Sequence, residues 1–202
     1  MNQVSLKFYY GAMGCGKTRK LQGDYYSKVE DGFEVIVIKP LIDTKGDSST
    51  LARDGGAVDT TFLIDKKDNI YFKIGAYLRE YKLDFILVDE AQFLESHHVE
   101  ELSDVVDILG INVICYGLRT DFKGDLFEGS KRLFEMADDL EGISRQCSCG
   151  NDKIYNMRLY NNIPVFEGEQ VAIDGVDATY KSVCRNCYKD AKKKALVRKK
   201  NG

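Results

Sequence analysis

The eight residues GAMGCGKT, numbers 11–18, constrain this chain more than any other stretch of its sequence. They follow residues 6–10, whose length and apolar composition predict a short buried strand, and they lead into residues 18–30, whose apolar side chains recur at helical spacing. Glycine adopts backbone conformations that other residues avoid, so three glycines at this place predict a tight loop. The sequence therefore predicts a strand, a glycine-rich loop and a helix in that order.

The loop fits the pattern G-x-x-x-x-G-K-[ST] of the phosphate-binding P-loop, in the strand–loop–helix context that this motif requires. In such a loop the backbone N–H groups and the N-terminus of the helix face phosphate oxygens. Lys17 is expected to reach the terminal phosphates, and the Thr18 hydroxyl is expected to ligate Mg²⁺. We predict that a nucleoside triphosphate binds with Mg²⁺ to Gly11, Ala12, Met13, Gly14, Cys15, Gly16, Lys17 and Thr18.

Three further short runs are apolar and rich in β-branched residues, at 34–39, 84–90 and 111–117. Because they lack polar alternation, both faces of each strand are expected to be buried, which is typical of a parallel sheet. Residues 70–81 and 96–109 lie between these runs and carry apolar residues at helical spacing. The alternation predicts an α/β fold, a P-loop doubly wound parallel sheet over residues 1–145. The polar, glycine-rich residues 43–61 are expected to form a long loop.

Two adjacent carboxylates, Asp89 and Glu90, end the buried run ILVDE. Asp89 stands where a P-loop protein holds the water shell of Mg²⁺, so the metal would lie between Thr18 and Asp89. Glu90 can face the reacting phosphate, where a carboxylate accepts a proton from an attacking hydroxyl in a kinase or orients a water in an ATPase. The two residues alone leave both reactions open.

Four of the six cysteines occur late in the chain, as Cys147 and Cys149 in CSC and as Cys184 and Cys187 in CRNC. In a reducing compartment clustered thiols favour a metal over disulfides, and four thiolates suit a tetrahedral zinc ion. Such a site is structural, because it leaves no open coordination position. The C-x-C spacing is closer than usual, and the alternative is a set of small buried thiols. We expect a small C-terminal zinc-binding domain over residues 146–191, where the sequence turns to short β-like pieces.

Charge and hydropathy argue against two classes of protein. A net charge of −3 does not suit a protein whose main task is to neutralise nucleic-acid phosphate. No apolar run approaches the roughly 18 residues that a membrane span requires. The N-terminal residues MNQVSLKFYYG lack the features of a secretory signal, so we expect a cytoplasmic protein. The basic tail, residues 192–202, is a row of like charges that we expect to be disordered.

Six motifs occur in order: FYYGAMGCGKT, LVDEAQFL, CYGLRTDFKGDLF, CSCG, EGEQVAIDG and YKSVCRNCY. Together they resemble the zinc-containing P-loop thymidine kinases, over residues 8–188, with the loop at 40–61 the least similar. A P-loop alone is shared by many families, whereas this ordered set is specific. The resemblance implies transfer of the γ-phosphate of ATP to the 5′-hydroxyl of thymidine, with Mg²⁺ beside ATP and structural Zn²⁺ at the four cysteines.

The resemblance also implies roles for single residues. Glu90 matches the general base, Asp89 matches the metal-binding acid, and Arg53 is similar to an arginine that contacts phosphates. The nucleoside-binding positions that it implies are Met13, Phe93, Leu118, Phe122, Phe127, Val171, Ile173, Gly175 and Tyr180. The last four belong to a lasso, residues 169–180, that closes over the base in the family. Val176 stands where many members have a second glycine, which leaves the conformation of the lasso open.

Two other functions remain as alternatives. One is a P-loop ATPase that acts on nucleic acid and carries the cysteines as a zinc ribbon, although the acidic net charge and the short chain count against it. The other is a kinase of a different nucleoside, such as deoxyuridine or deoxycytidine. From the resemblance we also expect a homotetramer that dTTP inhibits, with thymidine and ATP as partners and with neither nucleic acid nor membrane among them.

Overall fold

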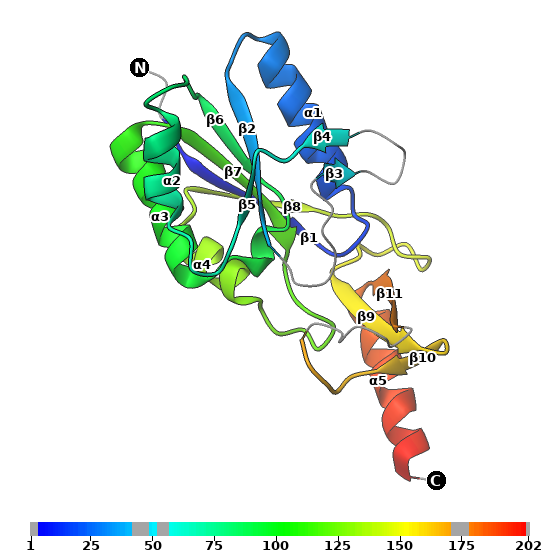
Figure 1. Ribbon diagram of the computed structural model, residues 1–202. Helices are drawn as coiled ribbons and strands as arrows, with labels where there is room; N and C mark the ends of the chain where they lie inside the picture. Colours follow the sequence, from blue (N-terminus) through cyan, green and yellow to red (C-terminus); the bar gives the residue numbers. More distant parts are fainter. Residues whose placement is uncertain (1–3, 42–48, 52–56, 171–177, 201–202) are drawn as a thin grey trace.

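The computed structural model describes residues 4–41, 49–51, 57–170 and 178–200, which form a large α/β domain and a small C-terminal domain (Figure 1). The large domain is built on a parallel sheet with the strand order β5-β2-β6-β7-β1-β8 among the described residues. Its strands are β1 Leu6–Gly11, β2 Val35–Pro40, β5 Phe62–Ile64, β6 Phe85–Val88, β7 Asn112–Leu118 and β8 Asp139–Ile143.

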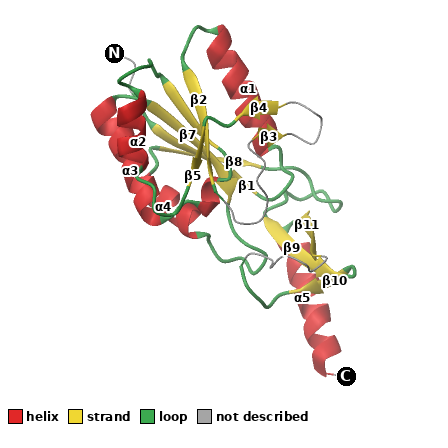
Figure 2. Cartoon of the chain, viewed as in Figure 1, coloured by secondary structure: helices red, strands yellow, loops and turns green. Residues whose placement is uncertain are grey.

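Helices cover both faces of this sheet. Helix α1, Lys17–Glu30, lies on one face, and α2 Ile70–Tyr77, α3 Ser96–Leu109 and α4 Glu128–Met136 lie on the other (Figures 1 and 2). Successive side chains of a strand point to opposite faces. Accordingly Phe8 belongs to the core under α2, α3 and α4, whereas its neighbour Tyr9 belongs to the core under α1. The predicted doubly wound α/β fold is confirmed.

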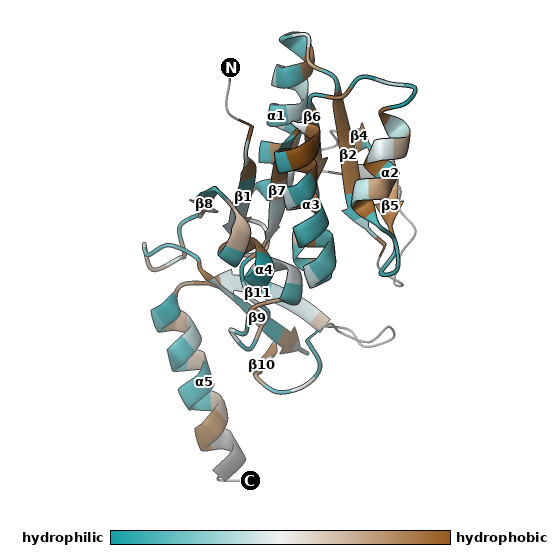
Figure 3. Cartoon of the chain, turned by 90° about the vertical axis from the view of Figure 1, so that its left-hand side faces the viewer, coloured by the Kyte–Doolittle hydropathy of each residue, from teal (hydrophilic) through white to brown (hydrophobic). Residues whose placement is uncertain are grey.

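The strands are apolar because both of their faces are covered. Val37 of β2 and Leu87 of β6 face α1, while Ile86 and Val88 of β6 face the other three helices, and all four side chains are fully buried. Figure 3 shows β2 and β6 largely in hydrophobic colours, with helices of mixed hydrophobic and hydrophilic residues beside them. The continuous apolar runs in the sequence thus correspond to strands of a buried parallel sheet.

The boundaries differ from those expected at several places. Helix α3 has the predicted bounds, but α2 ends at Tyr77, four residues early, and the chain then turns. The expected long loop contains a two-stranded antiparallel hairpin of β3, Ser49–Leu51, and β4, Ala57–Asp59. Strands β5 and β8 and helix α4 were not predicted, because each is short or interrupted by polar residues.

All parallel strands end at the same edge of the sheet, where α/β proteins usually bind ligands. The register pairs Gly11 with Leu118 and Val88 with Cys115, so the segments that follow β1, β6 and β7 emerge side by side. Those segments are the glycine-rich loop, the Asp89–Glu90 pair and the loop at 118–127. The fold thereby brings three separate motifs to one edge.

The small domain contains β9 Tyr155–Tyr160, β10 Ile163–Val165 and β11 Ala178–Val183 in the antiparallel order β10-β9-β11, followed by α5, Arg185–Lys200. Its core is small: Met157 and Val183 pack with Tyr188 of α5, whose ring stacks on Tyr155 at a centroid distance of 4.5 Å. No helix in the described part of the chain has the length and apolar character to cross a membrane.

The expectation that the basic tail is disordered from residue 192 is wrong as far as residue 200, because α5 continues to Lys200. Lysine, alanine, leucine and arginine have high helix propensity, and they dominate residues 192–200. A helix whose first turn is already fixed by packing, here at Tyr188, grows at little cost. Like-charge repulsion is therefore not decisive in this segment.

Candidate active site and cysteine cluster

The glycine-rich loop runs from the end of β1 to the start of α1. Gly14 and Gly16 have φ angles of 67° and 106°, in the left-handed region that favours glycine. At Gly11 a Cβ atom would lie 2.3 Å from the Ile143 carbonyl oxygen and 2.7 Å from Cys15 Sγ, so no larger residue fits. The predicted order of strand, loop and helix is present.

Two cationic side chains lie against this loop. Lys17 Nζ donates a hydrogen bond to the Ala12 carbonyl oxygen at 3.0 Å. Arg145, which follows β8, brings Nη2 within 3.7 Å of the Cβ position at Gly16. Sequence reasoning did not select Arg145, because it lies 129 residues after Gly16 and matches no motif. The loop is thus electropositive through its lysine, this arginine and the N-terminus of α1.

Asp89 is only 6% exposed and follows β6 directly, with its N–H donating to the Ile38 carbonyl oxygen at 3.0 Å. Burial raises the pKa of its carboxyl to about 6, and the charge of Glu90 acts in the same direction. The charges of Lys39 and Lys17 act against that rise, which places Asp89 within electrostatic reach of the loop lysine. A buried carboxylate of this kind favours a cation as its partner.

Glu90 has a left-handed backbone conformation, with φ 51° and ψ 36°, and opens a short 3₁₀ turn, η1, Ala91–Phe93. Such a conformation costs a non-glycine residue about 1 kcal/mol or more and persists only where the surroundings fix it. Gln92 Nε2 donates to Glu90 Oε2 at 2.5 Å. On the far side, Gly129 of α4 packs so closely that a Cβ would lie 2.5 Å from the Ala91 carbonyl oxygen. The turn that presents Glu90 is therefore tightly held.

The loop after β7, residues 118–127, is folded around the buried carboxylate of Asp121. Its Oδ1 atom accepts hydrogen bonds from the N–H groups of Lys123, Gly124 and Asp125 at 2.8, 2.9 and 2.9 Å. At the end of the loop the Phe127 ring meets the Phe93 ring edge to face, with centroids 5.5 Å apart. The loop thus carries the Phe127 ring to the turn that holds Glu90.

The small domain is hydrogen-bonded to both loops. Asn156 of β9, 2% exposed, accepts from the Met13 N–H at 2.8 Å and donates to the Thr120 carbonyl oxygen at 2.9 Å. The Ser182 hydroxyl of β11 donates to the Met13 carbonyl oxygen. One peptide unit on each side of Met13 is thereby fixed by a domain more than 140 residues away in the sequence.

Arg158 of β9 is 2% exposed and holds both described ends of the expected lasso. Its guanidinium donates to the carbonyl oxygens of Glu169 and Gln170 at 2.9 and 3.0 Å, and to the Tyr180 hydroxyl at 2.9 Å. It also lies over the Phe122 ring, 3.7 Å from the centroid. Residues 171–177, which complete the lasso, lie outside the described part of the chain.

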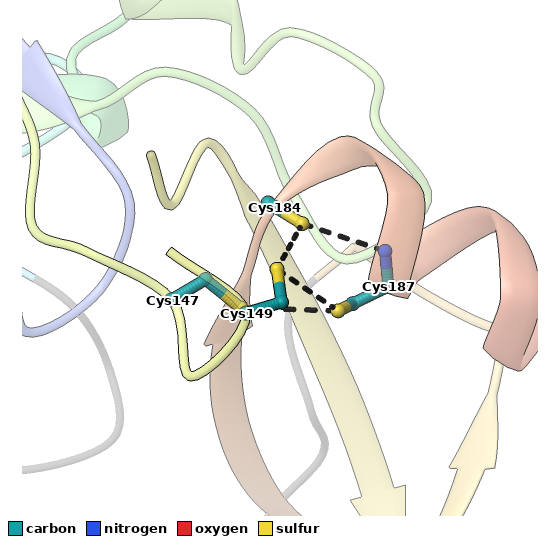
Figure 4. A group of neighbouring side chains, drawn as sticks. All are labelled: Cys147, Cys149, Cys184 and Cys187. Carbon is teal, nitrogen blue, oxygen red and sulfur yellow. Dashed lines mark hydrogen bonds between the residues drawn. The ribbon is translucent and has the colours of Figure 1, made fainter. Parts of the chain in front are cut away.

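The four late cysteines meet in one cluster, with their sulfur atoms all within 4.8 Å of one another (Figure 4). The Sγ atoms of Cys149 and Cys184 are 3.3 Å apart, and those of Cys147 and Cys187 are 3.9 Å apart. Zinc–sulfur bonds of about 2.3 Å at tetrahedral angles separate sulfurs by about 3.8 Å. The donor set and its spacing therefore fit a four-thiolate metal site.

Electrostatics in this cluster also favour a cation. Backbone N–H groups of Cys184 and Cys149 lower the pKa of Cys147 to about 6, whereas contact with the other sulfurs raises the pKa of Cys187 to about 12. Four thiolates this close repel one another, so they cannot all ionise without a positive charge among them. The C-x-C spacing does not prevent the cluster, because Gly150, at φ 88°, lets the chain turn back after Cys149.

The model of the family described as "Thymidine kinase" matches residues 4–188. The chain belongs to the thymidine kinase family. A thymidine kinase of Haemophilus influenzae is 41% identical over 188 residues, which are 93% of this chain and 97% of that protein. One from Legionella pneumophila is 39% identical over 92% of this chain and 90% of its own, and one from Pasteurella multocida is 40% identical over 93% and 97%. The relatives named here are thus matched over nearly their full lengths.

Among solved structures, the ATPase DotB of Legionella pneumophila overlays on 67% of this chain and 37% of its own, with 16% sequence identity and a TM-score of 0.32. That similarity is too low to bear on the function of this thymidine kinase family member.

Several residues that the thymidine kinase resemblance selects come together at the sheet edge. Phe93 touches Phe127, and Gln92 joins Glu90 to the Leu118 N–H. Met13 is linked to the loop at 118–127 through Asn156, while Phe122 and Tyr180 flank Arg158. Arg53, Val171, Ile173 and Gly175 lie outside the described residues.

Sequence reasoning missed four polar residues that organise the site: Gln92, Asn156, Arg158 and Ser182. Gln92 and Ser182 lie within motifs that carried no role for them, while Asn156 and Arg158 belong to no motif. Apart from Glu90 beside Gln92, their partners lie 11 or more residues away along the chain. One signal was available for Arg158, which is a lone charge between Met157 and Leu159 in a β-like run. A buried charge needs fixed partners, so such an arginine is a candidate for an organising role.

Proposed function

We propose that this protein phosphorylates thymidine, transferring the γ-phosphate of ATP to the 5′-hydroxyl and releasing dTMP and ADP. The observation that carries the proposal is the placement of Glu90: it follows β6 at the sheet edge where the glycine-rich loop and the loop at 118–127 also begin. With a phosphate donor on the glycine-rich loop and a flat acceptor beside the loop at 118–127, the Glu90 carboxylate would lie between donor and acceptor. Membership of the thymidine kinase family supports this assignment.

The donor side would use the residues of the glycine-rich loop. Its backbone N–H groups and the N-terminus of α1 would bind phosphate oxygens, with Lys17 at the terminal phosphates. Thr18, in the first turn of α1, and the buried Asp89 are the residues that would hold Mg²⁺. When bound, Mg²⁺ neutralises charge that develops on the phosphate oxygens. Arg145 would add a further positive charge at Gly16, and we propose Arg53 as another phosphate contact.

The reaction itself needs a base at the acceptor hydroxyl. Glu90 would accept the 5′-hydroxyl proton as the O5′–P bond forms and the bond from the γ-phosphorus to the ADP oxygen breaks. The other acid cannot take this role as readily, because Asp89 is buried and would be engaged with the metal. Asp89 would thus bind the metal, and Glu90 would act as the base at the acceptor hydroxyl.

The nucleoside would bind between the turn at Glu90, the loop at 118–127 and the lasso. Phe93 and Phe127 offer ring surfaces for a pyrimidine, and Leu118 begins the loop that carries Phe127. We propose that Met13 also contacts the nucleoside. We propose that Val171, Ile173, Gly175 and Tyr180 close over the base. A closed pocket excludes water, which would otherwise be phosphorylated in place of the sugar.

The four cysteines would hold a structural Zn²⁺ ion. Their sulfur spacing and their need for a cation support this, and a four-thiolate site leaves no position for a substrate. The ion would tie the segment before β9 to the start of α5, and so fix the domain that carries Asn156 and Arg158.

We further propose a cytoplasmic homotetramer that dTTP inhibits by occupying both substrate regions. The support is the family resemblance alone. Sedimentation analysis and inhibition by dTTP competitive with thymidine are the measurements that bear on it.

A substrate panel tests the proposed function. The protein with Mg-ATP should form dTMP and ADP in equal amounts, with thymidine preferred over deoxyuridine by about 10- to 200-fold in kcat/KM, the discrimination that one methyl group provides. Phosphate release that single-stranded DNA stimulates, with no nucleoside monophosphate formed, would instead identify a nucleic-acid-dependent ATPase. A preference for deoxycytidine would identify a kinase of a different nucleoside.

Arg158→Met should raise KM for thymidine by about 10- to 100-fold while kcat falls less. Methionine fills the space of the arginine stem but cannot donate to the carbonyl oxygens of Glu169 and Gln170 or to the Tyr180 hydroxyl, so both ends of the lasso lose their anchor. Such a loss on binding corresponds to about 1.4 kcal/mol for each factor of ten. Steady-state kinetics with thymidine varied at saturating ATP measure it.

Arg132→Met is the matched control, because Arg132 pairs with Glu100 and Glu135 on the outer surface of α3 and α4. Its kinetic constants should stay within about twofold of wild type, as is usual for exposed ion pairs. An Arg158→Met enzyme with unchanged KM for thymidine would show that the lasso does not depend on this anchor.

A further inference from the structure

Gln92 lies between two parts of the site and is bonded to both. Its side chain is 2% exposed; Nε2 donates to Glu90 Oε2 at 2.5 Å, and Oε1 accepts from the Leu118 N–H at 2.8 Å. The orientation of the amide is dictated by its partners, because an ionised carboxylate only accepts and a backbone N–H only donates. Both the amide nitrogen and the amide oxygen of Gln92 therefore have fixed hydrogen-bond partners.

The surrounding backbone leaves Gln92 no freedom to move. A Cβ atom at Gly117 of β7 would lie 3.0 Å from the Gln92 nitrogen and 3.1 Å from Oε1, so the strand packs directly against this residue. On the other side Gly129 of α4 meets Ala91 and Leu94 of the same turn at 2.5 and 2.7 Å from its Cβ position. The turn that carries Gln92 is thus packed between β7 and α4.

Among the described residues, Glu90 Oε2 is the oxygen of this carboxylate for which a hydrogen bond is present. Because Gln92 binds Oε2, it restricts the rotation of the carboxylate, and Oε1 is the oxygen that would accept from a substrate hydroxyl. The fixing point is the main chain of Leu118, where the loop at 118–127 begins. The orientation of the Glu90 carboxylate thus depends on the position of the loop at 118–127.

We infer that Gln92 is a positioning residue that aligns the Glu90 carboxylate with the nucleoside hydroxyl. It does so by joining that carboxylate through hydrogen bonds to the Leu118 N–H. The inference rests on the proposed function, in which Glu90 accepts the hydroxyl proton. A misalignment of about 1 Å can cost a factor of about 100 in rate, because the reacting atoms must meet in a narrow range of geometry. Gln92 itself contacts no reacting atom and acts only through Glu90.

The first variant is Gln92→Met, which keeps the length and volume of the side chain but removes both hydrogen bonds. Its kcat should fall about 10- to 100-fold, with KM for ATP within about threefold. The second variant, Gln92→Glu, keeps an acceptor for the Leu118 N–H and loses the donor to Glu90. It should lose kcat at least as much while KM for thymidine stays near the wild-type value.

A double-mutant cycle separates positioning from a general structural effect. In a Glu90→Ala background no carboxylate remains to be aligned, so adding Gln92→Met should change the residual turnover by less than about threefold. An undiminished effect of Gln92→Met in that background would overturn the inference. Thermal unfolding of each variant, and ATP binding, show whether the folded state is retained; Gln92→Glu carries the test if Gln92→Met does not fold.

Gln22→Met is the matched control, since Gln22 is another largely buried glutamine, on α1. Its turnover should stay within about twofold of wild type. Failure of this inference is distinguishable from failure of the proposed function. A wild-type protein that forms no dTMP contradicts the function, whereas an active wild type, an impaired Glu90→Ala and a normal Gln92→Met contradict only the role of Gln92.

Discussion

Glu90→Gln should lower the turnover of thymidine phosphorylation by about two to four orders of magnitude, the usual contribution of a general base. The amide has the shape of the carboxylate but cannot accept the proton that leaves the 5′-hydroxyl. It can still accept the hydrogen bond from Gln92 through its oxygen, so the left-handed turn at this position should be retained. The expected signature is a loss of kcat with dissociation constants for ATP and thymidine near their wild-type values.

Rapid-quench measurement of dTMP formation, together with calorimetric titration of each substrate, checks this expectation. Glu141→Gln is the control, because Glu141 belongs to β8 of the same sheet but has no role in the proposed reaction. Its Oε2 atom pairs with Lys7 Nζ at a distance of 3.1 Å. This variant should react at a rate within about twofold of wild type. Turnover of Glu90→Gln above about a tenth of wild type would remove Glu90 from the role of base.

Cys184→Ser should release the metal and unfold the small domain. Cys184 is buried in the core of that domain, and its sulfur lies 3.3 Å from Cys149 Sγ, so one of four ligands would be lost. Structural zinc contributes about 10 kcal/mol or more to the folding of small metal-dependent modules, and the core here is too small to replace it. We expect KM for thymidine to rise by about 100-fold or more, since each factor of ten costs about 1.4 kcal/mol of binding and the lasso loses its support.

Metal analysis, thermal unfolding and steady-state kinetics measure the three parts of this prediction. The control is Cys115→Ala, because Cys115 is buried in β7 and belongs to the core of the large domain. That variant should keep one zinc per chain even if its unfolding temperature falls, as expected for a smaller core side chain. A purified wild-type protein with no zinc, and with normal kinetics, would contradict the proposed metal site.

The features that the sequence predicted are those with local signals. The strands β1, β2, β6 and β7 are predominantly apolar runs, and α3 is amphipathic over its whole length, so period and composition located them. Strand β8 has the sequence DLEGI and pairs with β1 at the sheet edge, where polar residues are tolerated. It became a strand through pairing with a distant segment, which no local pattern records.

The same distinction applies to the candidate site. Lys17, Asp89 and the four cysteines belong to motifs whose spacing reflects the chemistry of phosphate and metal binding, so they were selected at once. Asn156 and Arg158 lie outside every motif and act through partners that are distant in sequence. Their importance follows from burial and hydrogen bonding, which only the folded chain displays.

The two hydrogen bonds at Met13 have a thermodynamic consequence. The Met13 N–H and carbonyl oxygen are held by Asn156 and Ser182, so the small domain grips the backbone of the loop proposed to bind the triphosphate. A ligand that shifts this backbone must move the small domain or break these bonds, and a ligand that tightens the small domain stiffens the loop. Binding free energies at two sites joined in this way are linked reciprocally. Any factor by which ATP strengthens thymidine binding would then equal the factor by which thymidine strengthens ATP binding.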